Sequence, residues 1–126
     1  MLNIGFDYDK CLTDPIVKMY CQELIKRGYD IFVISKRFQC GVNGLYGKSC
    51  SMIKNCLEIG ISLNDIIFTN MKSKVESIVK NNIQIFLDDN ILNVSEINNN
   101  TSCRVILYEN DKKFIEQIEQ LIKINK

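Results

Sequence analysis

Short apolar runs alternate along the chain with stretches in which apolar residues recur every three or four positions. The short runs are rich in β-branched and aromatic residues, as expected for strands buried on both faces of a sheet. Five runs fit this description: Asn3–Asp7, Asp30–Ile34, Ile66–Phe68, Ile83–Leu87 and Arg104–Leu107. Since their alternation with helical stretches is typical of βαβ units, the pattern predicts an α/β fold whose parallel sheet has helices on both faces.

The intervening stretches carry helix start and stop signals. Asp14-Pro15 combines a cap residue with a proline at the first helical position, and Gly28 follows the end of this helix. Further helices are predicted at Cys50–Leu57, Ser73–Asn81, Ile91–Ile97 and Lys112–Ile124. The segment Phe38–Lys48 contains Gly41, Gly44 and Gly47 without a clear period, and it is expected to be a flexible loop.

Length and charge narrow the class of protein. A chain of 126 residues with 46% hydrophobic and 25% charged residues is expected to form one globular domain, residues 1–126. The net charge of +1 means that nucleic acid is a candidate partner without support from overall charge. No apolar run approaches the roughly 20 residues that span a bilayer, and no signal-peptide pattern opens the chain. We therefore expect a cytoplasmic protein without membrane contact.

Cysteine and histidine usage restrict the chemistry further. The six cysteines form no C-x-x-C pair and are expected to be reduced thiols: Cys11, Cys21, Cys40, Cys50, Cys56 and Cys103. The chain has no histidine, which excludes His-based zinc sites, Ser-His-Asp triads and Cys-His dyads. Acid–base chemistry is therefore left to carboxylates, Lys, Tyr or Cys.

Polar residues follow the predicted strands at their carboxyl ends, where the loops of an open parallel sheet converge on one crevice. Asp7-Tyr8-Asp9 follows the first strand, Ser35-Lys36-Arg37 the second and Asp88-Asp89-Asn90 the fourth, and Lys74 begins the helix before the fourth strand. Carboxylates gathered in this way repel one another, and a divalent cation relieves the repulsion. Because Mg²⁺ prefers oxygen ligands and often shares them with phosphate, the cluster and its lysine indicate phosphoryl chemistry.

Four segments occur in a characteristic order: Ile4–Cys11, an apolar strand ending in D-x-D; Ile31–Ser35, an apolar strand ending in Ser; Lys74; and Ile85–Asp89, an apolar strand ending in DD. This series resembles the four motifs of the haloacid dehalogenase (HAD) superfamily over Asn3 to about Leu107. The resemblance implies a Rossmann-like sheet in the order 5-4-1-2-3 without a cap domain.

The resemblance also implies a Mg²⁺-dependent phosphohydrolase acting on a phosphomonoester. Asp7 would be the nucleophile that forms an aspartyl-phosphate, and Asp9 the acid–base residue. Ser35 and Lys74 would hold the transferring phosphoryl group. The Mg²⁺ ligands would be the Asp7 carboxylate, the Asp9 backbone carbonyl and Asp88, with Asp89 as an outer or alternative ligand. Lys72 is the rival of Lys74 for the phosphate-binding role.

Two positions depart from the family pattern: Cys11 stands where Thr or Val is preferred, and Lys10 where glycine is common. The helix that begins near Asp14 leaves almost no room for a cap domain after the first strand, and Gly60–Asp65 leaves none before the third strand. An open site accepts bulky phosphates, so a nucleotide or a nucleic-acid end is a candidate substrate. Lys36, Arg37 and Lys48 are candidate substrate-binding residues, and the loop Phe38–Lys48 is a candidate partial lid.

Two other classes of function remain open. A phospho-receiver signalling domain has similar length and an acidic Mg²⁺ pocket, but it would need its acceptor aspartate after the third strand, where Thr69-Asn70 stands. A non-catalytic HAD-like binding module is the third reading; retention of usable chemistry at all candidate catalytic positions counts against it.

Overall fold

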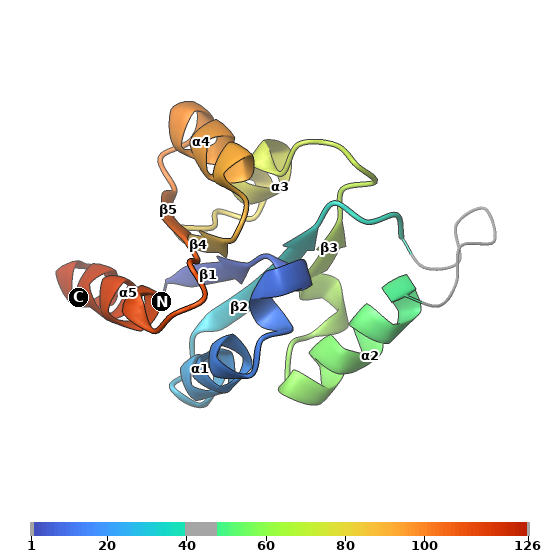
Figure 1. Cartoon of the computed structure of the whole chain (residues 1–126), viewed down its shortest axis with the longest axis horizontal. Helices are drawn as coiled ribbons and strands as arrows, with labels where there is room; N and C mark the ends of the chain where they lie inside the picture. Colours follow the sequence, from blue (N-terminus) through green and yellow to red (C-terminus); the bar gives the residue numbers. More distant parts are fainter. Residues whose placement is uncertain (1, 40–47, 126) are drawn as a thin grey trace.

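The five apolar runs pair into one parallel sheet in the computed structural model, which describes residues 2–39 and 48–125 (Figure 1). The strands are β1 (Asn3–Phe6), β2 (Asp30–Ser35), β3 (Ile66–Phe68), β4 (Ile85–Asp88) and β5 (Arg104–Leu107). Their order is β3-β2-β1-β4-β5. Because a sheet can be read from either edge, each strand has the neighbours that the order 5-4-1-2-3 assigns to it.

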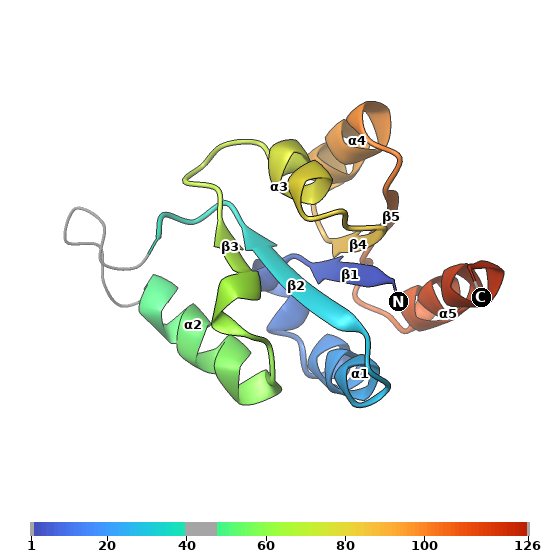
Figure 2. The same cartoon turned by 180° about the vertical axis from the view of Figure 1, so that it is seen from behind.

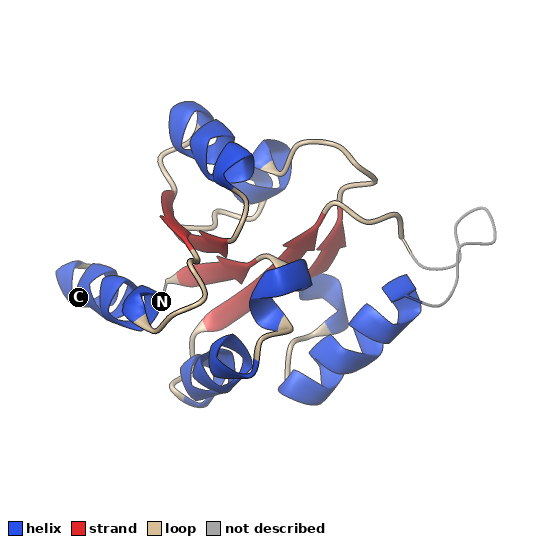
Figure 3. Ribbon diagram, viewed as in Figure 1, coloured by secondary structure: helices blue, strands red, loops and turns tan. Residues whose placement is uncertain are grey.

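Helices cover both faces of this sheet (Figures 1 and 3). On one face lie α1 (Pro15–Lys26), α2 (Lys48–Ile59) and α5 (Lys113–Ile124), and on the other lie α3 (Val75–Lys80) and α4 (Ile91–Asn100). Two short helical turns, η1 (Tyr8–Leu12) and η3 (Leu63–Asp65), complete the elements. The prediction of an α/β fold with a five-stranded parallel sheet and helices on both faces is confirmed.

The core is divided between the two faces because successive side chains of a strand point in opposite directions. Ile31 and Val33 of β2 are buried beneath α1 and α2, whereas Ile34 joins Phe86 in the cluster beneath α3 and α4. Gly5 of β1 faces the second cluster, and a Cβ atom there would lie 2.6 Å from Cδ1 of Phe86. The absence of a side chain at Gly5 therefore lets the Phe86 ring, two residues before Asp88, lie against the central strand.

Where the element ends differ from the predicted ones, they differ by one to three residues; the largest difference is at α4, which ends at Asn100 instead of Ile97. The fourth strand begins at Ile85 instead of Ile83, because the Ile83 N–H donates to the Ile78 carbonyl (3.0 Å) and closes the end of α3. Asp14 occupies the predicted cap position of α1, but its carboxylate accepts a hydrogen bond from the Tyr108 hydroxyl (2.9 Å) instead of capping the helix.

The connections around the sheet are short where the structure describes them. Only η1 separates β1 from α1, and only η3 separates α2 from β3, which agrees with the expectation that no cap domain fits at these two points. The segment 40–47, with Gly41, Gly44 and Gly47, lies outside the described residues, and so does the larger part of the predicted lid Phe38–Lys48.

Among the described residues no helix is long and apolar enough to cross a membrane.

The expectation that every cysteine is reduced is wrong for Cys50, which is disulfide-bonded. Cys11, Cys21, Cys56 and Cys103 are free and buried. A disulfide depends on the distance and direction between two side chains in the folded chain, and neither can be read from the spacing of cysteines in the sequence.

The buried thiols should make the protein sensitive to alkaline pH. Burial raises the pKa of Cys21, Cys56 and Cys103 to about 12. The unfolded chain releases these protons near pH 9, so the stabilisation is fully present below pH 9 and is lost as the pH rises towards 12. Burial also raises the pKa of Cys11 well above 9, so these four thiols contribute a slope of up to about 5 kcal/mol of unfolding free energy per pH unit in that window.

Urea unfolding at about pH 8 and about pH 10 measures this loss. In Cys21→Ala one of the four buried thiols is absent, so the part of the pH slope that comes from the thiols should be about a quarter smaller even though the variant also loses packing. A urea midpoint that is the same at both pH values in the wild type would contradict the prediction.

Candidate functional site

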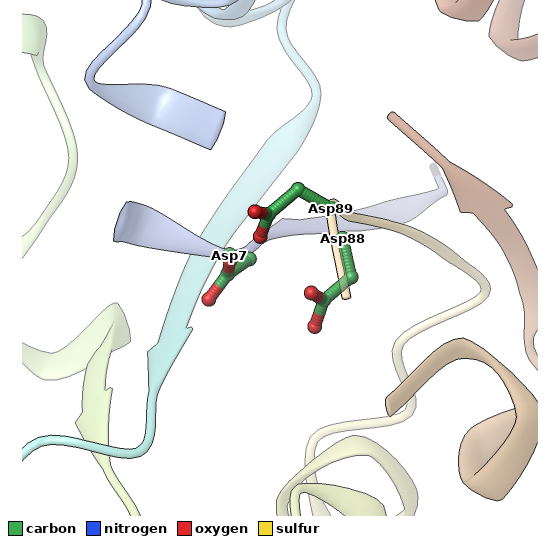
Figure 4. Close-up of side chains that lie close together, drawn as sticks. All are labelled: Asp7, Asp88 and Asp89. Carbon is green, nitrogen blue, oxygen red and sulfur yellow. The ribbon is translucent and has the colours of Figure 1, made fainter. Parts of the chain in front are cut away.

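The register of the two central strands brings two aspartates together. Phe6 of β1 pairs with Leu87 of β4, and the Asp7 N–H donates to the Leu87 carbonyl (2.8 Å). Asp7 and Asp88 therefore lie next to each other at the carboxyl edge of the sheet. Figure 4 shows their side chains with that of Asp89 around a common space. One carboxylate oxygen from each of the three lies within 4.8 Å of the others.

Lys74 enters this cluster from the turn before α3. Its ammonium donates to Oδ1 of Asp7 (2.6 Å) and to Oδ2 of Asp88 (2.8 Å), and the residue is only 1% exposed. Lys72 is exposed, and its carbonyl accepts a hydrogen bond from the Thr69 hydroxyl (2.7 Å). Of the two rival lysines, Lys74 is the one that contacts the carboxylates, while the Lys72 backbone shapes the turn after β3.

Asp88 is held by three donors. Besides Lys74, the Asn93 amide donates to its Oδ2 (3.3 Å) and the Asn90 backbone N–H donates to its Oδ1 (3.0 Å). The Asn90 side chain in turn caps α4 by accepting hydrogen bonds from the N–H groups of Leu92 and Asn93. Asn93 was not among the residues predicted from the sequence. The feature of the sequence that could have pointed to it is a polar residue one helical turn before Ile97, on the face of α4 that packs against the sheet.

The electrostatics of the cluster leave an excess of negative charge. Burial raises the pKa of Asp7 above its ordinary value; Lys74 opposes this effect and Asp88 adds to it. Burial lowers the pKa of Lys74, but Asp7 and Asp88 outweigh burial, so the net shift is upward and the lysine stays an ammonium. One ammonium faces two buried carboxylates and the half-buried Asp89, so the cluster is suited to a further cation.

The donor set fits Mg²⁺. The metal prefers six oxygen ligands at about 2.1 Å, so oxygens on opposite sides of the ion are about 4.2 Å apart. Adjacent oxygens of the same octahedron are about 3 Å apart. The carboxylate oxygens of Asp7, Asp88 and Asp89, all within 4.8 Å of one another, would move closer together around a bound ion. Lys10, in the turn after Asp9, has φ 56°, which lies in the left-handed region that glycine favours. The lysine thus adopts at this turn a conformation that glycine adopts readily.

Asp9 lies outside the carboxylate cluster. Its side chain is 52% exposed and forms an ion pair with Arg37, whose Nε donates to Oδ2 (2.9 Å) and whose Nη2 donates to Oδ1. The Arg37 guanidinium also lies over the ring of Tyr8, with 5.2 Å between its central carbon and the ring centroid. Arg37, expected to bind substrate, contacts the predicted acid–base residue.

Ser35 and Lys36 shape the loop after β2. The Ser35 hydroxyl is buried and accepts a hydrogen bond from the Arg37 N–H (3.1 Å). The Lys36 carbonyl accepts one from the Met71 N–H (2.6 Å), and the Thr69 N–H donates to the Ser35 carbonyl (2.9 Å). These bonds tie the loops after β2 and β3 together beside the site. The side chain of Lys48, another candidate, lies outside the described residues.

Comparison of the chain with protein-family models, curated proteins and solved structures finds no match. Fold and site alone therefore define the class: an α/β protein with a parallel sheet and a buried Asp–Lys–Asp cluster at the carboxyl edge of that sheet.

Proposed function

We propose that this protein is a Mg²⁺-dependent phosphomonoester hydrolase of the HAD type. The observation that carries the proposal is the buried ammonium of Lys74 between Asp7 and Asp88. Desolvating three charged groups costs free energy that their mutual attraction seldom recovers in full, so such a cluster is a weak choice for stability alone. Strongly perturbed groups gathered at the carboxyl edge of a parallel sheet support a catalytic role.

In the proposed first step, an Asp7 carboxylate oxygen attacks the phosphorus of the substrate. A bond forms between this oxygen and phosphorus, and the bond between phosphorus and the leaving oxygen breaks. Lys74 would place its ammonium against a phosphoryl oxygen and neutralise charge as the group is transferred. The Ser35 hydroxyl, at the end of the neighbouring strand, would donate to another phosphoryl oxygen.

Asp9 would supply the proton transfers. It would protonate the leaving oxygen in the first step and then accept a proton from the water that attacks the aspartyl-phosphate. That attack breaks the bond between the Asp7 oxygen and phosphorus, releases phosphate and restores the Asp7 carboxylate. The exposed side chain of Asp9, two residues after Asp7, suits contact with both the leaving group and water.

The carboxylates of Asp7, Asp88 and Asp89 and the Asp9 backbone carbonyl would hold Mg²⁺. When bound, the ion would supply positive charge that offsets the repulsion between these carboxylates and the phosphate. Asn93 and the Asn90 N–H would keep the Asp88 carboxylate in one orientation, as outer partners of metal ligands commonly do.

The strand order argues against the receiver alternative. Flavodoxin-like domains such as the receivers have the order 2-1-3-4-5, whereas the order here is β3-β2-β1-β4-β5. The residue after β3 is Thr69, whose hydroxyl donates to the Lys72 carbonyl, and it offers no carboxylate to phosphorylate. A non-catalytic binding module is the outcome that the following experiment would favour if turnover is absent.

The test is phosphate release from p-nitrophenyl phosphate with Mg²⁺ and with EDTA, followed by nucleotides and a 3′-phosphorylated oligonucleotide. We expect release with Mg²⁺ only, and Asp7→Asn prepared in parallel measures contaminating phosphatase. Absence of Mg²⁺-dependent release from every ester would overturn the proposed function. A stable aspartyl-phosphate after treatment with acetyl phosphate would favour a receiver instead.

A further inference from the structure

Four side chains form a continuous series of contacts from α2 to Asp9. The Asn55 amide donates to the Tyr8 hydroxyl (2.8 Å), and Tyr8 is buried. The Arg37 guanidinium lies over the Tyr8 ring and contacts both oxygens of Asp9. The exposed carboxylate of Asp9 is thus linked through Arg37 and Tyr8 to the rigid body of a helix.

The backbone of Arg37 is fixed as well. Its N–H donates to the Ser35 hydroxyl (3.1 Å), and its carbonyl accepts a hydrogen bond from the Asn70 N–H (3.2 Å). A guanidinium that is held by its backbone and by an aromatic ring loses little further freedom when it binds a carboxylate. Two parallel hydrogen bonds also set the plane of that carboxylate, which a single contact would leave free to rotate.

We propose that Arg37 is a positioning residue that orients the Asp9 carboxylate for proton transfer. This inference rests on the proposed function, because it assigns Arg37 to the acid–base step of that reaction. It replaces the expectation that Arg37 binds substrate. The guanidinium already forms hydrogen bonds to both carboxylate oxygens of Asp9 and would have to break them in order to bind a phosphate. Orientation is a large factor in such steps: a misplacement of about 1 Å can reduce a rate by about 10²-fold.

The experiment compares esters that differ only in their need for a proton. A p-nitrophenolate leaves without protonation, a phenolate benefits from it and an alkoxide requires it. We expect Arg37→Gln to reduce kcat/KM for an alkyl phosphate by about 10- to 100-fold and for p-nitrophenyl phosphate by less than about threefold. Arg37→Lys, which keeps the charge but not the paired hydrogen bonds, should recover only part of the loss.

A double-mutant cycle shows whether Arg37 acts through Asp9. Single-turnover rates for phenyl phosphate would be measured in Arg37→Gln, Asp9→Asn and the double variant. We expect Arg37→Gln to change the rate by less than about twofold once Asp9 is Asn, because residues that act as a unit are non-additive. Equal losses on all three esters, or additive losses in the cycle, would overturn the inference and return Arg37 to substrate binding.

The chain supplies a matched control in Arg27, which also holds a carboxylate with two hydrogen bonds, to Glu119 (2.8 and 3.2 Å), and also lies over a tyrosine ring. It follows the last residue of α1, shortly before the amino end of β2, whereas Asp7 and Asp88 lie at the carboxyl ends of the strands. Figure 2 shows the connection from α1 into β2. Arg27→Gln should leave all three ester rates unchanged. If the wild type releases phosphate but the losses in the double-mutant cycle are additive, only the inference about Arg37 is overturned. If the wild type releases no phosphate, the proposed function is overturned as well.

Discussion

Asp7→Asn is expected to reduce Mg²⁺-dependent phosphate release by at least about 10³-fold, a typical consequence of removing a nucleophile. The amide has nearly the same shape as the carboxylate but is a poor nucleophile, so the covalent step is lost. The variant should stay folded, because the substitution removes repulsion from Asp88 at the same time as it weakens the contact with Lys74. Initial rates and urea unfolding, measured on one preparation, separate these two effects.

Asp30→Asn is the matched control for this experiment. Asp30 is an exposed aspartate in the first position of β2, at the amino end of the strand, whereas the site lies at the carboxyl ends. Its substitution should leave the rate unchanged. Acid quenching during turnover should trap phosphate on the wild type and none on Asp7→Asn. Retention of more than about a tenth of the rate by Asp7→Asn would contradict the nucleophilic role.

Lys74→Met is expected to destabilise the protein by about 3 kcal/mol or more in EDTA, because removing one partner of a buried ion pair leaves the others without compensation. The Lys74 side chain is 2% exposed, and those of Asp7 and Asp88 are 12% and 0% exposed, so solvent screens these charges little. Mg²⁺ should restore part of the lost stability by supplying positive charge among the same carboxylates. Phosphate release should be abolished, since Met offers no ammonium to the phosphoryl group.

Lys72→Met provides the comparison that separates the two lysines. Lys72 is exposed, and a substitution there should change the unfolding free energy by no more than about 0.5 kcal/mol. Urea unfolding of both variants in EDTA and in Mg²⁺ checks the prediction. Similar destabilisation by the two substitutions would contradict the central role of Lys74, and stability that does not respond to Mg²⁺ would contradict a cation site at the three aspartates.

Much of the fold follows from local features of the chain. The five apolar runs mark all the strands that the structure describes, because a strand buried on both faces needs apolar side chains at nearly every position. Asp14-Pro15 marks the start of α1, because proline suits the first turn of a helix. Element ends were less accurate, as at Ile83, where a hydrogen bond to Ile78 decides the boundary.

Part of the candidate site is also encoded locally. Asp7 and Asp88 each follow an apolar strand, and parallel strands place their carboxyl ends at one edge. Their proximity could therefore be expected before any distance was known. The contacts of the longer side chains could not be expected in the same way. A lysine or arginine side chain can reach several positions around its own backbone, and the neighbouring residues in the folded chain decide among these positions.

The sequence by itself determined the α/β class, the positions of the strands and the gathering of acidic residues at one edge, since these depend on hydrophobic period and on strand direction. Only the tertiary structure decided that Lys74 and not Lys72 contacts Asp7 and Asp88, that Asn93 supports Asp88, and that Arg37 binds Asp9. It also decided that Cys50 is disulfide-bonded. Each of these depends on distances of a few ångströms between residues far apart in the chain, which exist only after the helices and strands have packed.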